Sequence, residues 1–149
     1  MKHLGLYFFN IFVIAPITTR LYLKVSKMKI DYESFPSLTT MILQFLFLFV
    51  MNDFFFYWAH RLLHVPFFYK HIHKWHHEFS VTVAYAVIYA HPLEVIFGNQ
   101  LTFMIPTLAL GDKLHLVTYL CFFFYKVVNA HFAHSGFVLP INMGGYYPF

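Results

Sequence analysis

Charged residues are scarce in this chain. Asp, Glu, Lys and Arg make up 11% of its 149 residues, whereas hydrophobic residues make up 60% and aromatic residues 23%. Charged side chains form about a quarter of an ordinary soluble protein, so this composition excludes a soluble globular domain and indicates a membrane protein. The formal net charge of +4 comes from basic residues near the ends of apolar segments, as in topology signals, and not from a basic stripe that would bind nucleic acid.

Cysteine is almost absent. The one cysteine, Cys121, lies within an apolar run, which excludes a disulfide framework and a cysteine-based zinc motif. The sequence also lacks an internal repeat, a small-residue cleavage site after its apolar N-terminus, and any alternating strand pattern. Backbone groups in lipid must bond within a helix or a closed barrel. These absences therefore predict an all-α, polytopic membrane protein with three or four membrane-embedded helices.

Apolar segments mark the expected helices. Residues 4–23 are long enough to cross a hydrocarbon core of about 30 Å if the helix continues past Pro16, which we expect to kink it. A polar connector follows, and residues 38–59 form the clearest span. Two later runs, 95–110 and 114–128, are each a little short for an independent span, so we expect a tilted or re-entrant hairpin there.

Histidine is abundant by contrast, and six of the eleven histidines follow the clearest span closely. They are His60, His64, His71, His73, His76 and His77. Side chains three or four residues apart share one face of a helix. Two helix faces that each offer imidazoles can converge on one or two metal ions, so this cluster predicts a metal site.

A proline divides the cluster between two expected helices. Pro66 disfavours helical geometry in the residue before it, so His60 and His64 end one helix and a second helix is expected over residues 67–79. On that second helix His73, His76 and His77 share one side. His71 lies on another side and is expected to face solvent or to support the site from outside.

Two carboxylates are candidate partners of these imidazoles. Asp53 lies on the helix stripe that leads through Tyr57 to His60, and Glu94 follows directly on Pro92. A carboxylate that accepts an N–H from a ligating imidazole commonly orients it. Each carboxylate also has an ordinary alternative, because Asp53 can face headgroup water and Glu94 can stabilise a helix N-terminus.

Among the histidines later in the chain, three are considered as candidates for the site. His131 and His134 are three apart and can share a helix face. His115 stands alone at the start of an apolar run, so we expect it at the membrane interface and not in a metal site. A pH-sensitive interface is the alternative explanation for the whole histidine set.

Four short motifs follow one another along the chain: HRLLH at 60–64, HKWHHEF at 73–79, YAHPLE at 89–94 and HSG at 134–136. In this order and spacing they resemble the membrane-bound fatty acid hydroxylase superfamily, and within it most closely the sterol C4-methyl oxidases. The connector KMKIDYESFPS is also similar to the one ahead of the long span in sterol oxidases.

The resemblance implies one domain over residues 1–149, with a helical membrane anchor under a histidine-rich helical cap that binds two iron ions, for which zinc can substitute. The metal ligands implied by position are His60, His64, His73, His76, His77 and His134, with His131 as a further candidate. Asp53 and Glu94 would support them. Family members carry another HxxHH box after HSG, whereas no histidine follows His134 here. We therefore expect the domain to be incomplete at its C-terminus, and also at its N-terminus, where the family usually has another membrane segment.

The resemblance also implies an activity. Family members use a reduced di-iron site and O₂ to hydroxylate an unactivated C–H bond, with electrons from NAD(P)H through cytochrome b5 or a reductase. A 4-methyl sterol is the substrate of the sterol oxidases. The expected partners are the lipid bilayer, a sterol or other lipid substrate, an electron-transfer protein and further membrane subunits. The endoplasmic reticulum is the expected location, with a mitochondrial membrane as the alternative for a subunit of a complex.

The absent third box leaves three interpretations open. The chain is the core of an oxidase whose remaining portion lies elsewhere in a longer protein, or a catalytically inactive membrane subunit derived from the family. In the third interpretation a separate chain supplies the last histidines.

Overall fold

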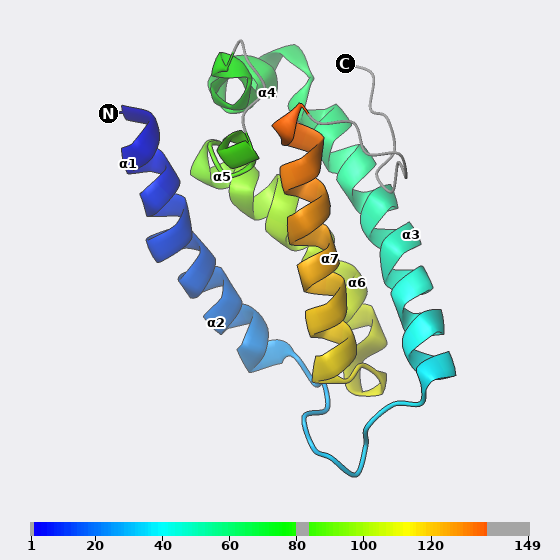
Figure 1. The fold of residues 1–149 in the computed structure, drawn as a ribbon. Helices are drawn as coiled ribbons and strands as arrows, with labels where there is room; N and C mark the ends of the chain where they lie inside the picture. The colour runs from blue at the N-terminus through cyan, green and yellow to red at the C-terminus, as the bar shows by residue number, and fades with distance from the viewer. Residues whose placement is uncertain (1, 80–83, 137–149) are drawn as a thin grey trace.

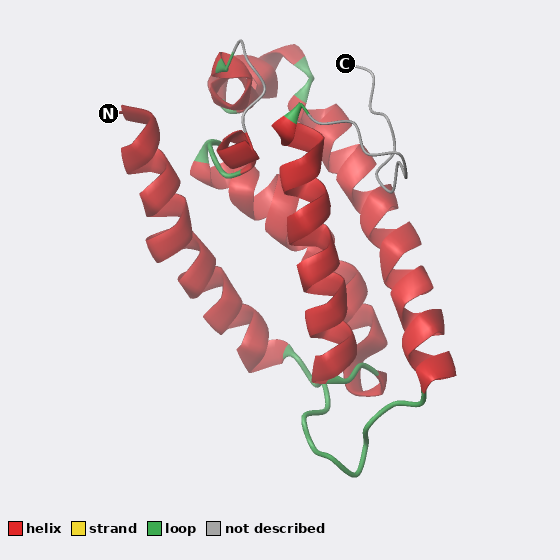
Figure 2. Ribbon diagram, viewed as in Figure 1, coloured by secondary structure: helices red, strands yellow, loops and turns green. Residues whose placement is uncertain are grey.

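The computed structural model describes residues 2–79 and 84–136, which form an almost entirely helical protein (Figures 1 and 2). In chain order the elements are α1 (Lys2–Phe9), η1 (Asn10–Ile14), α2 (Ala15–Val25), α3 (Leu38–Leu63), α4 (Pro66–His71), η2 (His73–Glu78), η3 (Ala84–Val87), α5 (Pro92–Glu94), η4 (Val95–Gln100), α6 (Leu101–Leu110), η5 (Gly111–Lys113) and α7 (Leu116–Ser135). The elements η1 and η4 are π-helical turns, and η2, η3 and η5 are 3₁₀ helices.

Four helical stretches in the described part of the chain are long and apolar enough to cross a membrane. They are Leu4–Val25, Leu38–Leu63, Pro92–Lys113 and Leu116–Ser135. With 20 to 26 residues each, they extend over about 30–39 Å at 1.5 Å per residue. The prediction of an all-α membrane protein with three or four embedded helices is confirmed.

The last two spans are longer than the sequence analysis predicted. The third span begins at Pro92, whose fixed φ and missing N–H suit the first helical position. The fourth continues through the polar HFAHS segment to Ser135 and ends at Gly136, which has a φ of 75°. The predicted short hairpin over 95–110 and 114–128 is therefore wrong. The prediction counted only the apolar runs, whereas both helices continue into polar residues at their ends.

The first span is one continuous helix made of α1, η1 and α2, and its irregularity lies just before Pro16. The N–H of Ala15 bonds to the carbonyl of Asn10, five residues earlier, which defines the π-helical turn. Pro16 has no N–H and its ring crowds the preceding turn. The structure thus shows a π turn next to Pro16, and the kink itself stays a prediction.

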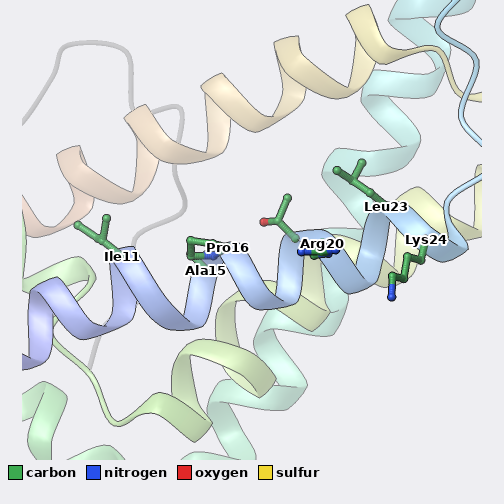
Figure 3. Close-up of a pocket in the computed structure, with 7 residues that line it drawn as sticks. Ile11, Ala15, Pro16, Arg20, Leu23 and Lys24 are labelled. Carbon is green, nitrogen blue, oxygen red and sulfur yellow. The ribbon is translucent and has the colours of Figure 1, made fainter.

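One side of this first span is open. A mostly apolar groove runs along it, lined by Ile11, Ala15, Pro16, Thr19, Arg20, Leu23 and Lys24. Figure 3 shows Ile11 and Leu23 on the side of the helix that faces α7. Elsewhere the helix is attached by buried contacts, where the ring of Tyr22 stacks on Tyr119 and its hydroxyl donates to Thr107 at 3.1 Å.

The core lies between α3, α6 and α7, which run side by side in Figure 1. Its buried members are Leu48, Phe103, Leu114 and Phe122. The rings of Phe103 and Phe122 stack with their centroids 5.6 Å apart. A buried amide adds a directional contact, because Asn52 Nδ2 donates to the carbonyl of Thr102 at 3.0 Å and joins α3 to α6.

Backbone contacts tie the ends of the spans opposite the histidines. Lys29, in the connector after the first span, donates to the Leu114 carbonyl and accepts from the Leu116 N–H, both at 2.8 Å. Gln44 of α3 donates to the carbonyl of Lys113 at 2.6 Å. The turn between the third and fourth spans is therefore fixed to the connector and to α3.

The cap beyond α3 contains two short helices in place of the single helix predicted over residues 67–79. The backbone breaks at Ile72, with φ of −125° and ψ of −65°, between α4 and η2. The prediction of one helix is wrong because tertiary contacts override local helical periodicity here. The break lets His73 become fully buried while His71 stays exposed.

Replacing Leu48 by Ala should destabilise the bundle. Leu48 is completely buried against the aromatic core, and removing a buried leucine side chain costs about 2–5 kcal/mol. We expect a clear fall in Tm in detergent. The matched control is Leu43→Ala on the same helix, where the side chain is 63% exposed and the Tm should change little. Equal shifts in the two variants would contradict the core described above.

Candidate metal centre

The last two turns of α3 supply the first two imidazoles. His60 and His64 share one helix face, as predicted, and their Nε2 atoms are 3.1 Å apart. His64 is the C-cap residue of α3 and Pro66 begins α4. The chain therefore turns away directly after the second histidine, which leaves both rings at the end of the span.

The second histidine motif adds two more nitrogens to this group. His73 is completely buried, and its Nε2 is 3.2 Å from Nε2 of His64. Nε2 of His77 lies 2.9 Å from Nε2 of His73. Ring nitrogens of His60, His64 and His73 all lie within 4.8 Å of one another. These four histidines form one convergent set, which we name the four-histidine group.

The remaining two predicted ligands form a separate pair beside this group. Nε2 of His76 on η2 lies 3.1 Å from Nε2 of His134, near the end of α7. The ring of His76 is parallel to that of His73, at 5.7 Å between centroids. The structure thus brings together all six histidines that the sequence motifs suggested, as a group of four and a pair.

Hydrogen bonds on the other ring nitrogen fix the direction of three imidazoles. Nδ1 of His73 lies 2.8 Å from Oε1 of Glu94, in a buried contact. Nδ1 of His76 is 3.2 Å from the carbonyl of Tyr89, and Nδ1 of His134 is 2.8 Å from the carbonyl of Ala130. A carbonyl only accepts hydrogen bonds, so each Nδ1 carries the proton and each Nε2 presents a lone pair.

This arrangement fits a bound cation. In the His76 and His134 pair two lone pairs face each other at 3.1 Å, which is unfavourable unless a proton or a metal ion lies between them. Two nitrogens that each lie about 2.1 Å from one metal ion at a right angle are about 3 Å apart. Neutral imidazoles suit iron and zinc. The four-histidine group has enough donors for one ion, whereas the pair supplies only two.

Glu94 is the carboxylate that the structure brings to the site. Besides its contact with His73, it lies in the first turn of the third span, where Pro92 is the first helical residue. The structure thus places Glu94 both against an imidazole and in the first turn of a helix. A carboxylate in this position favours the Nδ1–H tautomer of His73 and keeps its Nε2 free for a metal.

Asp53 is the other carboxylate considered in the sequence. It is exposed on α3, seven residues before His60, and that spacing is about 10.5 Å of helix rise. Its charge acts on Tyr125 and Lys126 of α7. The supporting role of Asp53 toward the imidazoles therefore stays a prediction.

His131 also lies apart from the convergent nitrogens. Its Nδ1 is bonded to the carbonyl of Val127 at 2.7 Å, at the exposed side of α7. It lines a shallow apolar depression together with Ala84, Val127, Val128, Phe132 and Ser135. A spacing of three places His131 and His134 on nearby faces, but the helix turns only His134 toward His76.

Two histidines expected outside the cluster are outside it. His71 is exposed, and its Nδ1 bonds to the Phe67 carbonyl within α4. His115 lies at the other end of the bundle, where its Nδ1 accepts from the N–H of Val117 and its Nε2 bonds to the carbonyl of Asp31. His115 therefore caps α7 and stabilises the connector.

Tyr89 and Glu78 are two contributors that the sequence analysis did not assign. The Tyr89 hydroxyl donates to Oε2 of Glu78 at 2.6 Å, and Tyr89 is completely buried. Burial and this bond to Glu78 raise the pKa of Tyr89 to about 12, so the phenol remains a donor. The motifs HKWHHEF and YAHPLE contain both residues, but a pairing between them has no periodic signature in sequence.

Three imidazoles of the site, those of His64, His76 and His77, have a lowered pKa. Burial lowers the pKa of His76 to about 4, with a further contribution from His134. Burial and the neighbouring His73 lower the pKa of His77 to about 4. The same two causes lower the pKa of His64. Neutral imidazole is the form that binds metals, so these three rings favour their metal-binding form at neutral pH.

Comparison with known proteins agrees with the histidine geometry. The profile of the fatty acid hydroxylase family matches residues 45–147, a range that contains all six convergent histidines. The chain belongs to the fatty acid hydroxylase family. The resemblance inferred from the four motifs is confirmed. No solved structure gives a significant match.

The relatives have several different activities. The chain is 36% identical over 135 residues to a fatty acid hydroxylase of Mycosarcoma maydis, covering 89% of this chain and 35% of that protein. It is 37% identical over 126 residues to a C-4 methylsterol oxidase of Candida albicans, covering 83% and 41%. It is 40% identical over 114 residues to a very-long-chain aldehyde decarbonylase of Oryza sativa, covering 76% and 37%. The chain thus spans 35–41% of the length of these relatives.

Acid should destabilise the metal-free protein. In the fold the pKa of His76 is lowered from 6.5 to about 4, so between these pH values the unfolded chain binds more protons and the free energy of unfolding falls as the pH falls. We expect the Tm of chelator-treated protein in detergent to decrease from pH 7 to pH 5. His76→Asn should reduce this slope, whereas His71→Asn, at an exposed position, should keep it. Identical slopes in the two variants would contradict the assignment.

Proposed function

We propose that this chain carries the larger part of a di-iron oxygenase site that hydroxylates a C–H bond of a membrane lipid. The observation that supports the proposal is the convergence of six Nε2 atoms at neighbour distances of 2.9–3.2 Å. Three of these rings carry their proton on Nδ1, toward a carboxylate or carbonyl. Membership of the fatty acid hydroxylase family favours iron over zinc in this site.

In this proposal the residues have distinct roles. The four-histidine group would hold one iron ion, and His76 with His134 would hold a second. Bound iron in this family supplies the activation of O₂. Around the first group, Phe56 stacks on His60 at 5.5 Å and Tyr69 stacks on His64 at 5.8 Å. Each aromatic ring covers one face of an imidazole, while His64 stays exposed.

The proposed substrate is a 4-methyl sterol, as in the C-4 methylsterol oxidase relatives. Three of the histidines, His60, His64 and His134, lie at the ends of two apolar spans, α3 and α7, where a lipid in the bilayer can bring a methyl group to the site. Hydroxylation consumes the substrate, O₂, two electrons and two protons and gives an alcohol and water. NAD(P)H would supply the electrons through cytochrome b5 or a reductase, in the endoplasmic reticulum membrane.

The two-donor pair favours completion of the site by residues outside those described. Two imidazoles are too few to hold an iron ion tightly, and the chain spans 35–41% of the length of its relatives. Further donors would come from a longer form of this protein or from a second chain. A catalytically inactive subunit of a membrane complex, in the endoplasmic reticulum or a mitochondrial membrane, is the competing proposal.

Metal analysis separates these proposals. We expect the purified protein to contain iron, and about two iron ions per chain would contradict the inactive-subunit alternative. His64→Ala should lower the iron content, because it removes a central donor of the four-histidine group, while His71→Ala should leave it unchanged. If a second chain completes the site, His64→Ala should lower metal content with that chain still bound. Absence of metal from the unmodified protein would contradict the oxygenase proposal.

Product analysis tests the substrate. The full-length protein in membranes, supplied with NAD(P)H, its reductase and ¹⁸O₂, should convert a 4-methyl sterol to a product that contains one ¹⁸O atom, detected by mass spectrometry. The same preparation with His60→Ala should give none, because the site would lack a donor. Labelling of a long-chain fatty acid, with no labelling of the sterol, would reassign the substrate class.

A further inference from the structure

A buried amide in the first span makes contacts that the histidine motifs do not explain. Asn10 opens the π turn η1, and its side chain is 1% exposed. Its Nδ2 donates to the carbonyl of Ala90 at 2.9 Å and to the carbonyl of Ile88 at 3.0 Å. One side chain of the first span therefore holds two backbone groups that lie about eighty residues later in the sequence.

These two carbonyls lie on either side of the carbonyl that orients His76. The carbonyl of Tyr89 accepts the Nδ1–H of His76, and the Tyr89 hydroxyl is bonded to Glu78, two residues after His76. The segment Ile88–Ala90 is thus fixed from one side by Asn10 and from the other by η2. A displacement of this segment would move the Tyr89 carbonyl, which accepts the Nδ1–H of His76.

The chemistry of these contacts is unambiguous. Backbone carbonyls have no hydrogen to donate, so the amide nitrogen of Asn10 must face them and use one hydrogen for each. Among the described residues the amide oxygen of Asn10 is buried without a hydrogen-bond partner. A buried polar atom without a partner is unfavourable, so an apolar side chain would suit this helix better. The contribution of Asn10 is therefore its pair of N–H donors to the carbonyls of Ile88 and Ala90.

The π turn determines where Asn10 points. It lies directly ahead of Pro16 and widens the helix by one residue at this level. The turn also contacts η4, the π turn that follows Glu94 in the third span. Irregular turns of this kind often occur at functional sites. The first span thus meets the cap at the Tyr89 segment and close to the carboxylate partner of His73.

We propose that Asn10 is a positioning residue for the metal pair formed by His76 and His134. It holds Ile88–Ala90 in place, and the Tyr89 carbonyl then fixes the tautomer and direction of the His76 ring. The inference rests on the proposed function in that it takes His76 as a metal ligand. Asn10 lies outside residues 45–147, which match the family, so this role would extend the site to the first span.

The substitution Asn10→Asp tests the proposal, because it keeps the shape but replaces two donors by an acceptor facing two carbonyls. We expect the affinity for the second iron ion to fall about 10- to 100-fold, as when outer partners of metal ligands are removed, with the first ion retained. The matched control is Asn52→Asp, another 1% exposed asparagine that donates to a single carbonyl, that of Thr102. Its iron content per folded chain should match that of the unmodified protein.

A metal-independent measurement separates this inference from the proposed function. In chelator-treated protein labelled with ¹⁵N-histidine, the His76 ring should show the Nδ1–H tautomer, and Asn10→Asp should weaken that signal while Asn52→Asp preserves it. If the unmodified protein binds no metal but Asn10→Asp still weakens the His76 Nδ1–H signal, the proposed function is contradicted and the positioning role is supported. Unchanged His76 signals in Asn10→Asp would overturn the positioning role, whatever the metal content.

A second pair of variants keeps the test possible if the first variant does not fold. If Asn10→Asp does not fold, Asn10→Leu removes the same donors without adding charge, and Asn52→Leu is its control. A change in the His76 signal in Asn10→Leu alone supports the proposal. Equal changes in both leucine variants would show a general effect of losing a buried amide and would overturn it.

Discussion

The contact between Nδ1 of His73 and Oε1 of Glu94 is the one on which the arrangement of the cap depends. It is buried, it is 2.8 Å long, and it joins η2 to the first turn of the third span. It turns Nε2 of His73 toward His64 and His77. Without it a buried imidazole would lack a fixed tautomer, and the four-histidine group would lose its central member.

Backbone carbonyls orient the rings of the other two histidines, His76 and His134. Tyr89 and Ala130 hold the Nδ1 protons of His76 and His134, so these rings depend on the local backbone and not on a charged partner. The two halves of the site are thus oriented by different means. One uses a carboxylate within a span, and the other uses the course of the chain around residues 88–90, which the first span supports through Asn10.

The length of the apolar runs predicted the first two spans, and spacing along a helix predicted which histidines share a face. HRLLH and HxxHH spacing identified five of the six convergent histidines, and HSG identified His134. The break at Ile72, the turn of His131 away from the site and the contacts of Asp53 with α7 depend on packing between distant segments, which single-helix geometry does not encode. Asn10 gave no signal, since one asparagine in an apolar run has no partner that spacing can identify.

The backbone bonds of Lys29 to Leu114 and Leu116 give the bundle two unlike ends. At one end the connector and the turn before α7 are joined by peptide groups, Gln44 of α3 bonds to that turn, and His115 contributes an imidazole. At the other end α3, η2 and α7 meet through imidazoles. Protonation of the imidazoles between α3, η2 and α7 would therefore weaken contacts chiefly at that end, whereas the bonds of Lys29 and Gln44 at the far end do not titrate.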